Sequence, residues 1–279
     1  MKKGCCLKKA ISILLLVLTM VSVFAISASA SSGVGVYIGG EKFTGNVQVT
    51  NNTTYVGIRK FATAMDASAK VSYDYSTRTL TIKTSKLSLT CKDGSNYIVA
   101  NGRYLYFDEP IYMRSGIMYA PVLLLYKAFD AKIKWDNSYH GFLITKGSGA
   151  IKSGDSYYRS DEVYWLARII SAESRGEPLL GKIAVGNVIL NRVKSKAYPN
   201  TIYGVIFDKK YGVQFSPASN GTIYNEPTSE SIIAAKICLE GYSISNKILY
   251  FVNPKKAPNS WISKNGTLFT KIGNHAFYY

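Results

Sequence analysis

The sequence has little that could hold a metal or build a disulfide framework. Its 279 residues include four cysteines and two histidines. A zinc or copper site needs several nitrogen, sulfur or carboxylate ligands together, and small disulfide-stabilised domains need many cysteines. We therefore expect no metal and no other cofactor, and we expect Cys91 and Cys238 to be two separate buried thiols.

Long apolar runs are also scarce, and the clearest one lies at the N-terminus. The segment "MKKGCCLKKAISILLLVLTMVSVFAISASASS" has lysines first, then an apolar run, then the small residues Ala28-Ser29-Ala30. This order predicts a secretory signal peptide over residues 1–30, cleaved after Ala30. A retained membrane anchor is the alternative, although the run is short for a spanning helix. We expect a secreted protein that meets the membrane only through this segment before cleavage.

Acidic residues are half as common as basic ones. The chain has 17 Asp and Glu against 34 Lys and Arg, a net charge of +17. Cleavage after residue 30 removes four lysines and no acid, which leaves 17 − 4 = +13. A basic exported protein concentrates on polyanions, and outside a bacterial cell these are the anionic polymers and peptide carboxylates of the wall. No nucleic-acid motif or dense basic stripe is present, so we expect no nucleic-acid partner.

The first half of the chain repeats itself. "TTYVGIRKFATAMDASAKVSYDYSTRTLTI" (Thr53–Ile82) aligns with "IMYAPVLLLYKAFDAKIKWDNSYHGFLI" (Ile117–Ile144), mostly at apolar positions. Each copy predicts a short helix, a turn, a strand that ends in Tyr or Trp followed by Asp, and a second strand. A strand pair turning at glycine precedes each copy. The order of the matches favours duplication over chance similarity.

This pattern resembles, from Val34 to Thr145, the domain named after the N-terminal region of copper amine oxidase. The name implies no copper chemistry here, because the region has a single histidine, His140. We expect a duplicated β-rich accessory domain over residues 31–146, which serves as a binding module or a spacer and has no catalytic role. The small, polar stretch "GSGAIKSGDS" predicts a linker over residues 147–158, followed by a second domain over residues 159–279.

A carboxylate ends the first helix predicted in the second domain. The helix begins near Asp161, with acids in its first turn. Its apolar stripe consists of Val163, Leu166, Ala167 and Ile170. Glu173 continues that stripe, and Gly176 with Pro178 stops the helix just beyond it. Both burial and the C-terminal end of the helix dipole disfavour an anion, so we expect Glu173 to stay protonated and able to act as a general acid. The alternative is a structural glutamate tied to Arg175 or to loop amides.

Several separated motifs follow in order: "AESRGEP", "GKIAVGNVILNRV", "VQFSP", "YFVNP" and "IGNHAFY". From about Asp161 to the C-terminus they resemble the cell wall hydrolase family of the spore cortex-lytic enzymes (SleB type). The resemblance implies a mainly helical, lysozyme-like catalytic domain, so that the whole chain is α+β. It also implies peptidoglycan as substrate, with cleavage between N-acetylmuramic acid and N-acetylglucosamine and Glu173 as the catalytic acid.

Members of that family are generally lytic transglycosylases, in which the hydroxymethyl group of muramic acid displaces the glycan bond. A two-carboxylate hydrolase needs a second acid across the cleft. Glu177 and Glu226 are not obvious second acids, although both stay open. Aromatic faces and amides suited to sugars occur in the later motifs. The expected substrate-binding residues are Gln214, Phe215, Tyr250, Phe251, Asn253 and His275.

Each of these assignments has an alternative. Phe215 and Phe251 suit the core equally well, and His275 is interpreted either as a substrate contact or as a satisfied core histidine. A zinc amidase is disfavoured because the second domain has one histidine, His275. A cysteine peptidase fits poorly because Cys238 lies deep in a predicted helix. A wall-binding protein without activity stays open, as do roles in the spore cortex and in the vegetative wall.

Overall fold

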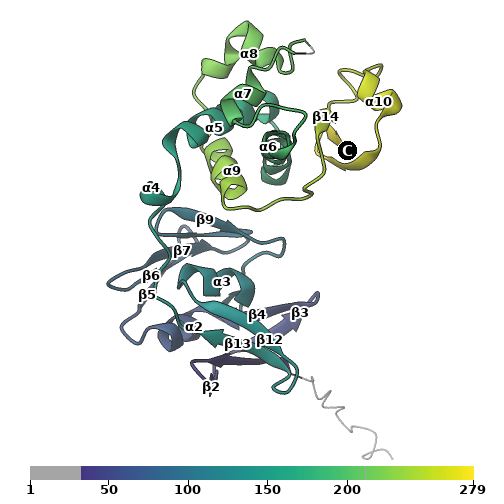
Figure 1. The fold of residues 1–279 in the computed structure, drawn as a ribbon. Coiled ribbons are helices and arrows are strands. Elements are labelled where there is room, and N and C mark those ends of the chain that lie inside the picture. Colours follow the sequence, from purple (N-terminus) through teal and green to yellow (C-terminus); the bar gives the residue numbers. More distant parts are fainter. Residues whose placement is uncertain (1–32, 211) are drawn as a thin grey trace, which may run out of the picture. The chain divides into compact units, whose positions relative to one another are not determined.

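The structure is a computed structural model that describes residues 33–210 and 212–279. The predicted signal peptide lies outside these described residues. Within them, no helix has both the length and the apolar character needed to cross a bilayer. The α+β prediction is confirmed, because a β-rich region is followed by a mainly helical one (Figure 1).

The β-rich region is built from strands with two short helices. Its strands are β1 (Gly35–Ile38), β2 (Glu41–Lys42), β3 (Val47–Thr50), β4 (Thr53–Gly57), β5 (Lys70–Asp74), β6 (Thr79–Lys83), β7 (Ser88–Lys92), β8 (Tyr97–Ala100), β9 (Arg103–Tyr106), β10 (Tyr112–Arg114), β11 (Ile117–Pro121), β12 (Lys132–Asp136) and β13 (Gly141–Thr145). Its helices are α2 (Ile58–Met65) and α3 (Val122–Ala128). The sheets run in the orders β12-β13-β1-β2, β10-β11-β4-β3 and β5-β6-β7-β8-β9.

The predicted repeat is confirmed by the element order. The first copy is β4-α2-β5-β6 and the second is β11-α3-β12-β13, and β4 pairs with β11 in the central sheet. Asp74 accepts hydrogen bonds from the backbone N–H and hydroxyl of Ser76, at 2.8 and 2.7 Å. Asp136 accepts the same two bonds from Ser138, at 3.0 and 2.5 Å. The aspartate that closes each strand therefore fixes the turn into the next one.

One core holds both copies together. Phe61 of α2 and Phe129, just after α3, are almost fully buried, with ring centroids 6.0 Å apart. Strand β1 pairs in parallel with β13, so the first strand of the region completes the sheet of the second copy. Ile151 of the predicted linker also joins this core, at 9% exposure. A short helix, α4 (Gly154–Tyr157), ends the linker segment.

The second region packs helices around a central one. Its helices are α5 (Ser160–Ser174), α6 (Leu179–Lys194), α7 (Ile202–Ile206), α8 (Ser216–Asn220), the 3-10 helix η2 (Thr222–Tyr224), α9 (Ser229–Leu239) and α10 (Trp261–Asn265). Helix α6 is buried along most of its length. A Cβ on Gly186 would lie 2.7 Å from Sγ of Cys238 and 2.9 Å from Cδ1 of Ile170, so glycine permits the close approach of α5, α6 and α9. Cys91 and Cys238 are confirmed as separate buried thiols.

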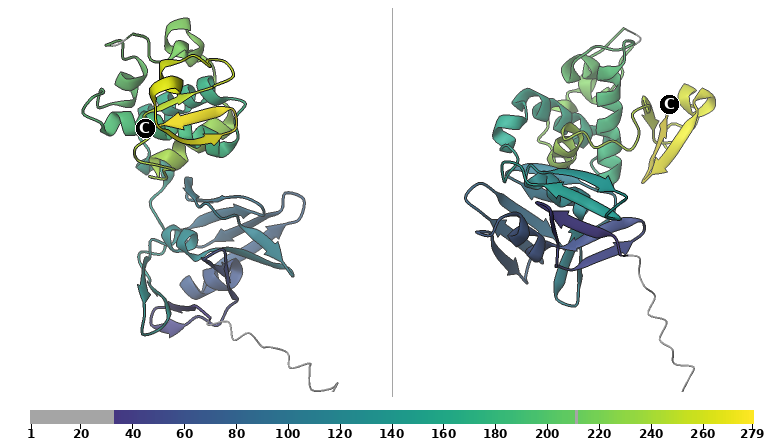
Figure 2. Two further views of the ribbon diagram at one scale, coloured as in Figure 1. Left: turned by 90° about the vertical axis from the view of Figure 1, so that its right-hand side faces the viewer. Right: turned by 60° about the horizontal axis from the view of Figure 1, so that its bottom comes forward.

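A small sheet follows the helices. Its strands are β14 (Tyr250–Val252), β15 (Leu268–Ile272) and β16 (His275–Tyr278), in the order β14-β16-β15. Figure 2 shows this C-terminal sheet in yellow beside the green helices. Phe251 is paired with Phe277, so the "YFVNP" and "IGNHAFY" motifs lie side by side.

Candidate active site

Glu173 is the next-to-last residue of α5, as the sequence predicts. In the preceding turns the side chains of Leu166 and Ile170 are fully buried. Burial raises the pKa of the Glu173 carboxyl to about 7. Within the described residues no group donates a hydrogen bond to it, and Arg175 donates instead to the carbonyl of Glu226 (3.1 Å). The carboxyl is therefore poised between its neutral and charged forms near neutral pH.

Glu173 lines a groove of about 1100 Å³. The walls come from the end of α5, the start of α8, β14 with the loop after it, and the turn before β16. Five of the six predicted binding residues line this groove, namely Gln214, Phe215, Phe251, Asn253 and His275. The structure thus gathers residues that are up to about a hundred positions apart in sequence around one carboxyl group.

Tyr250 does not line this groove. Its hydroxyl lies 3.2 Å from the hydroxyl of Tyr198, and its ring centroid lies 5.5 Å from the guanidinium carbon of Arg192. Neighbouring residues of a strand point to opposite faces, so Phe251 faces the groove while Tyr250 lies behind its wall.

Glu177, which the sequence left open as a second acid, lines the groove. It is 8% exposed, and its two carboxylate oxygens accept hydrogen bonds from the backbone N–H (2.8 Å) and the side-chain amide (3.1 Å) of Asn274. Burial works to raise the pKa of Glu177, but the bonds from Asn274 and the nearby His275 and Lys182 outweigh it and hold that pKa below its usual value. Glu177 is therefore an ionised carboxylate at neutral pH.

The turn that Glu177 holds depends on a glycine. Gly273 has φ +58°, and a Cβ there would lie 2.0 Å from Oε2 of Glu177. A side chain would therefore meet both backbone strain and a clash. The Gly-Asn pair in "IGNH" was the available sequence signal, because such pairs mark tight turns.

His275 begins β16 beneath this turn. It is 7% exposed, and its Nδ1 lies 4.0 Å from Oε1 of Glu177 without a hydrogen-bond partner among the described residues. Burial lowers the pKa of His275, although Glu177 acts in the opposite direction. The ring stands edge-on to Phe251, with centroids 5.3 Å apart. His275 is thus a neutral wall residue at neutral pH.

Arg192, near the end of α6, also lines the groove and was missed by sequence reasoning. Its Nε donates to the carbonyl of Leu249 (2.8 Å) and its Nη1 to Oε1 of Gln214 (3.4 Å). Burial lowers the pKa of Arg192, and no carboxylate pairs with it within the described part of the chain. Arg192 therefore orients Gln214 at the groove wall.

Glu226 is not part of the groove. Its Oε1 accepts a hydrogen bond from Arg168 (2.7 Å), and its side chain is 86% exposed. The charged residues that line the groove are Arg175, Arg192, Lys255 and Lys256 against Glu173 and Glu177. Four cations against two acids give 4 − 2 = +2, so the groove suits an anionic chain. Among the residues that the structure describes, no group of three or more His, Cys, Asp or Glu could hold a metal ion.

Known proteins share this region. Residues 176–278 match the family described as Cell Wall Hydrolase. The cell wall hydrolase CwlJ of Oceanobacillus iheyensis is 30% identical over 107 residues, which are 36% of this chain and 74% of that protein. This chain belongs to the cell wall hydrolase family. The family match starts at Gly176, so it does not include Glu173.

Spore cortex-lytic enzymes are also similar to this cell wall hydrolase, which confirms the SleB-type resemblance. The enzyme of Bacillus cereus is 38% identical over 120 residues, 43% of this chain and 45% of that protein. The enzyme of Bacillus subtilis is 33% identical over 120 residues, 43% of this chain and 38% of that protein. The chain thus spans less than half the length of these curated relatives.

A solved structure also matches, the catalytic domain of the germination-specific lytic transglycosylase SleB from Bacillus anthracis. It is 35% identical, and the match covers 46% of this chain and 100% of that chain with a TM-score of 0.40. The β-rich region matches a different family. Residues 37–144 match the copper amine oxidase N-terminal domain, which confirms the second predicted resemblance.

Proposed function

We propose that this protein degrades peptidoglycan by cleaving the glycan bond between N-acetylmuramic acid and N-acetylglucosamine, with Glu173 as the acid. One observation carries the proposal: a carboxyl group with a pKa of about 7 lines a groove of about 1100 Å³. A protonated carboxyl can give its proton to the glycosidic oxygen as the bond breaks. Membership in the cell wall hydrolase family supports peptidoglycan as the polymer in the groove.

The surroundings of Glu177 favour transglycosylation over hydrolysis. Both of its carboxylate oxygens accept hydrogen bonds from Asn274, which hold this carboxylate on the turn and lower its pKa, so it is a weaker base toward a water molecule. The hydroxymethyl group of muramic acid then acts as the nucleophile. Glu173 gives its proton to the leaving oxygen and takes the proton of the attacking hydroxyl, which leaves an anhydro sugar end and regenerates the acid.

The rest of the groove suits a glycan that carries acidic peptides. Phe251 is half-buried and offers an apolar ring face to a sugar, whereas Phe215 is 3% exposed and belongs to the core behind it, with the two ring centroids 6.4 Å apart at an interplanar angle of 27°. Oδ1 of Asn253 accepts from the backbone N–H of Lys255 (3.0 Å), which leaves its amide nitrogen for an N-acetyl carbonyl. Lys255 and Lys256 stand where they would meet peptide carboxylates.

Export of the protein is part of the proposal. Its substrate lies outside the cytoplasmic membrane, and the first 30 residues have the lysines, apolar run and small-residue end of a signal peptide. The mature charge of 17 − 4 = +13 would hold the protein on peptidoglycan and on anionic wall polymers.

Digestion of purified peptidoglycan by wild type and by Glu173→Gln, with mass analysis of the fragments, tests the proposal. We expect the wild type to release muropeptides with anhydro ends and the variant to release none. Glu226→Gln is the control, because its carboxylate lies outside the groove, and it should retain activity. Reducing ends in place of anhydro ends would mean hydrolysis. Binding without any fragments from the wild type would leave the non-catalytic wall-binding protein as the better reading.

A further inference from the structure

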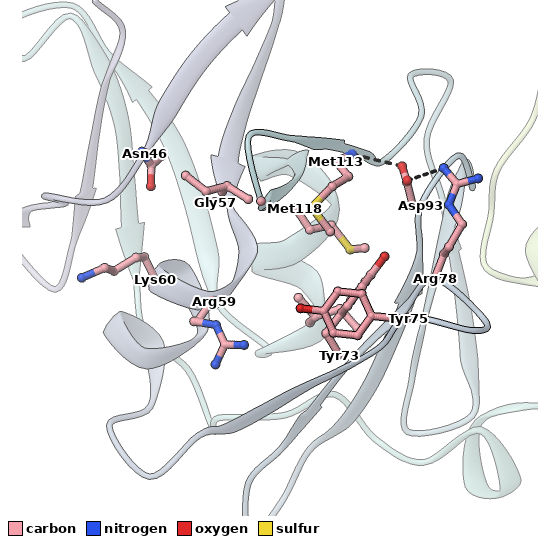
Figure 3. A pocket seen from close by; sticks show the side chains of 13 residues that line it. Asn46, Gly57, Arg59, Lys60, Tyr73, Tyr75, Arg78, Asp93, Met113 and Met118 are labelled. Atoms are coloured by element: carbon pink, nitrogen blue, oxygen red, sulfur yellow. Dashed lines mark hydrogen bonds and ion pairs between the residues drawn. The ribbon is translucent and has the colours of Figure 1, made fainter.

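The β-rich region contains a cavity of about 570 Å³, separate from the active-site groove. Ligand sites are of about this size, roughly 300–1,000 Å³. Figure 3 shows the side chains around it, most of which come from the first repeat and from the β10–β11 hairpin. Its apolar lining consists of Leu80, Met113, Ile117 and Met118.

Positive charge gathers at this cavity. Arg59, Lys60 and Arg78 line it against one acid, Asp93, so the balance is 3 − 1 = +2. Asp93 is already satisfied, because it pairs with Arg78 and accepts the backbone N–H of Met113 (3.0 Å). Arg59 and Lys60 therefore carry the charge that no acid at the cavity balances.

Both of these cations retain free donors. Arg59 gives one hydrogen bond from Nη1 to the carbonyl of Val71 (3.1 Å), and the rest of its guanidinium has no partner within the described residues. The ammonium group of Lys60 makes no hydrogen bond or ion pair to any residue that the structure describes. A guanidinium with free donors suits a carboxylate or a phosphate, and Lys60 adds positive charge at the cavity.

Tyrosines complete the lining. The rings of Tyr73 and Tyr75 meet edge to face, with centroids 4.9 Å apart. Tyr75 is 86% exposed, which leaves a large aromatic face in water. Such a face, next to an apolar lining and two cations, suits a ligand that is part apolar and part anionic.

The second repeat shows that the fold does not require this chemistry. In the aligned copy Leu123 and Leu124 replace Arg59 and Lys60. Leu124 is 1% exposed and belongs to the core. The same backbone thus forms with aliphatic residues at both positions, so the two cations are a property of the first copy and not of the fold.

We propose that this cavity binds a short peptide through its free carboxylate and an apolar side chain, and that in the wall this peptide is the stem peptide of peptidoglycan. The choice of ligand rests on the proposed function, whereas the site itself rests on the cavity. Arg59 takes the carboxylate while Lys60 adds positive charge at the edge of the cavity, Met113 and Met118 take methyl groups, and Tyr75 covers the backbone. A polyol phosphate such as a teichoic acid chain is polar throughout and would leave the apolar lining unused.

Calorimetric binding to the mature full-length chain tests the proposal, with the free stem tetrapeptide, its C-terminal amide and glycerol 3-phosphate as probes. All measurements use the Glu173→Gln background, so that binding is scored independently of cleavage. Arg59→Gln and Tyr75→Ala change exposed side chains and keep the core intact. Each should weaken tetrapeptide binding about 3–10-fold, the loss expected for one charge-assisted or aromatic contact.

Lys132→Gln is the matched control, because Lys132 is an exposed lysine of the second repeat outside the cavity, and it should bind like the parent. The amidated peptide should bind more weakly than the free acid. Equal binding by the parent, Arg59→Gln and Tyr75→Ala would overturn the site, and tighter binding of glycerol 3-phosphate would overturn the ligand class. If the wild type has no lytic activity but the cavity variants show the expected losses of peptide binding, only the proposed function is overturned.

Discussion

Glu173 and Glu177 line one groove, yet their pKa values are shifted in opposite directions. Burial without a hydrogen-bond donor raises the pKa of Glu173 to about 7, whereas Asn274 helps to hold that of Glu177 below its usual value. Helix α5 ends between them, so one carboxyl stays on the helix and the other reaches the turn before β16. Two carboxyl groups with separated pKa values are a common basis for assigning acid and charged roles.

Activity should fall as the pH rises through about 7. The reaction needs protonated Glu173, and its pKa of about 7 places the loss of the proton there. Initial rates of anhydro-muropeptide release, measured from about pH 5 to pH 9, should show this basic limb. A rate that stays constant across the neutral range would contradict the role of Glu173 as the acid.

Gly273→Ala should destabilise the protein by about 2 kcal/mol. The alanine would have to adopt a positive φ, and its Cβ would lie 2.0 Å from Oε2 of Glu177. Urea unfolding measures the change in the free energy of unfolding. Gly176→Ala is the control, because a Cβ at Gly176 meets nothing within 4 Å, and it should be nearly neutral. Similar midpoints for the two variants would show that the turn tolerates a side chain.

Glu177→Ala should cost about 1–3 kcal/mol at neutral pH, because it leaves the donors of Asn274 without their acceptors. The pKa of Glu177 is lower in the folded than in the unfolded chain, so its contribution is present above the unfolded pKa and is lost as the pH falls through the folded one. Wild type and variant should therefore converge in stability in acid. Glu41→Ala, at an exposed position of β2, is the control, and a constant difference at every pH would contradict the linkage.

Gln214→Ala should weaken substrate binding about fivefold and leave the catalytic rate constant almost unchanged. Gln214 lines the groove, whereas its partner Arg192 holds it from the wall. Tyr250→Phe removes only a hydroxyl that lies against Tyr198 behind the wall, so it should leave KM within about twofold of wild type. A larger effect from Tyr250→Phe than from Gln214→Ala would reverse the placement of the two residues.

Local patterns predicted much of the fold. The duplicated strand–helix–strand units were readable because apolar spacing and the closing aspartates recur at matched positions. The place of Glu173 followed from helix periodicity and from the stop at Gly176 and Pro178. Its catalytic role stays a prediction, since its burial and its pKa show that it can carry a proton near neutral pH and not that it transfers one to a substrate.

Contacts between residues far apart in the sequence could not be predicted. Glu177 and Asn274 are 97 positions apart, so nothing local in "RGEP" shows that its glutamate binds a turn at the other end of the domain. Tyr250 and Phe251 differ in role because the pairing of β14 with β16 sets which face of the strand meets the groove. A strand of three residues is too short to show an alternation of apolar and polar residues that would predict this face. Arg192 lies near Lys194 at the end of α6, where a cation is expected to face solvent, yet it is buried.

The parallel pairing of β1 with β13 joins the first strand of the β-rich region to its last strand, so the sheet needs both. Because β1 lies between β13 and β2, a chain that began after Ile38 would leave β13 with an open edge of unpaired backbone groups. Another molecule could then add a strand there. Shortening this protein from its N-terminal side would therefore turn β13, an interior strand of this sheet, into an edge at which self-association could start.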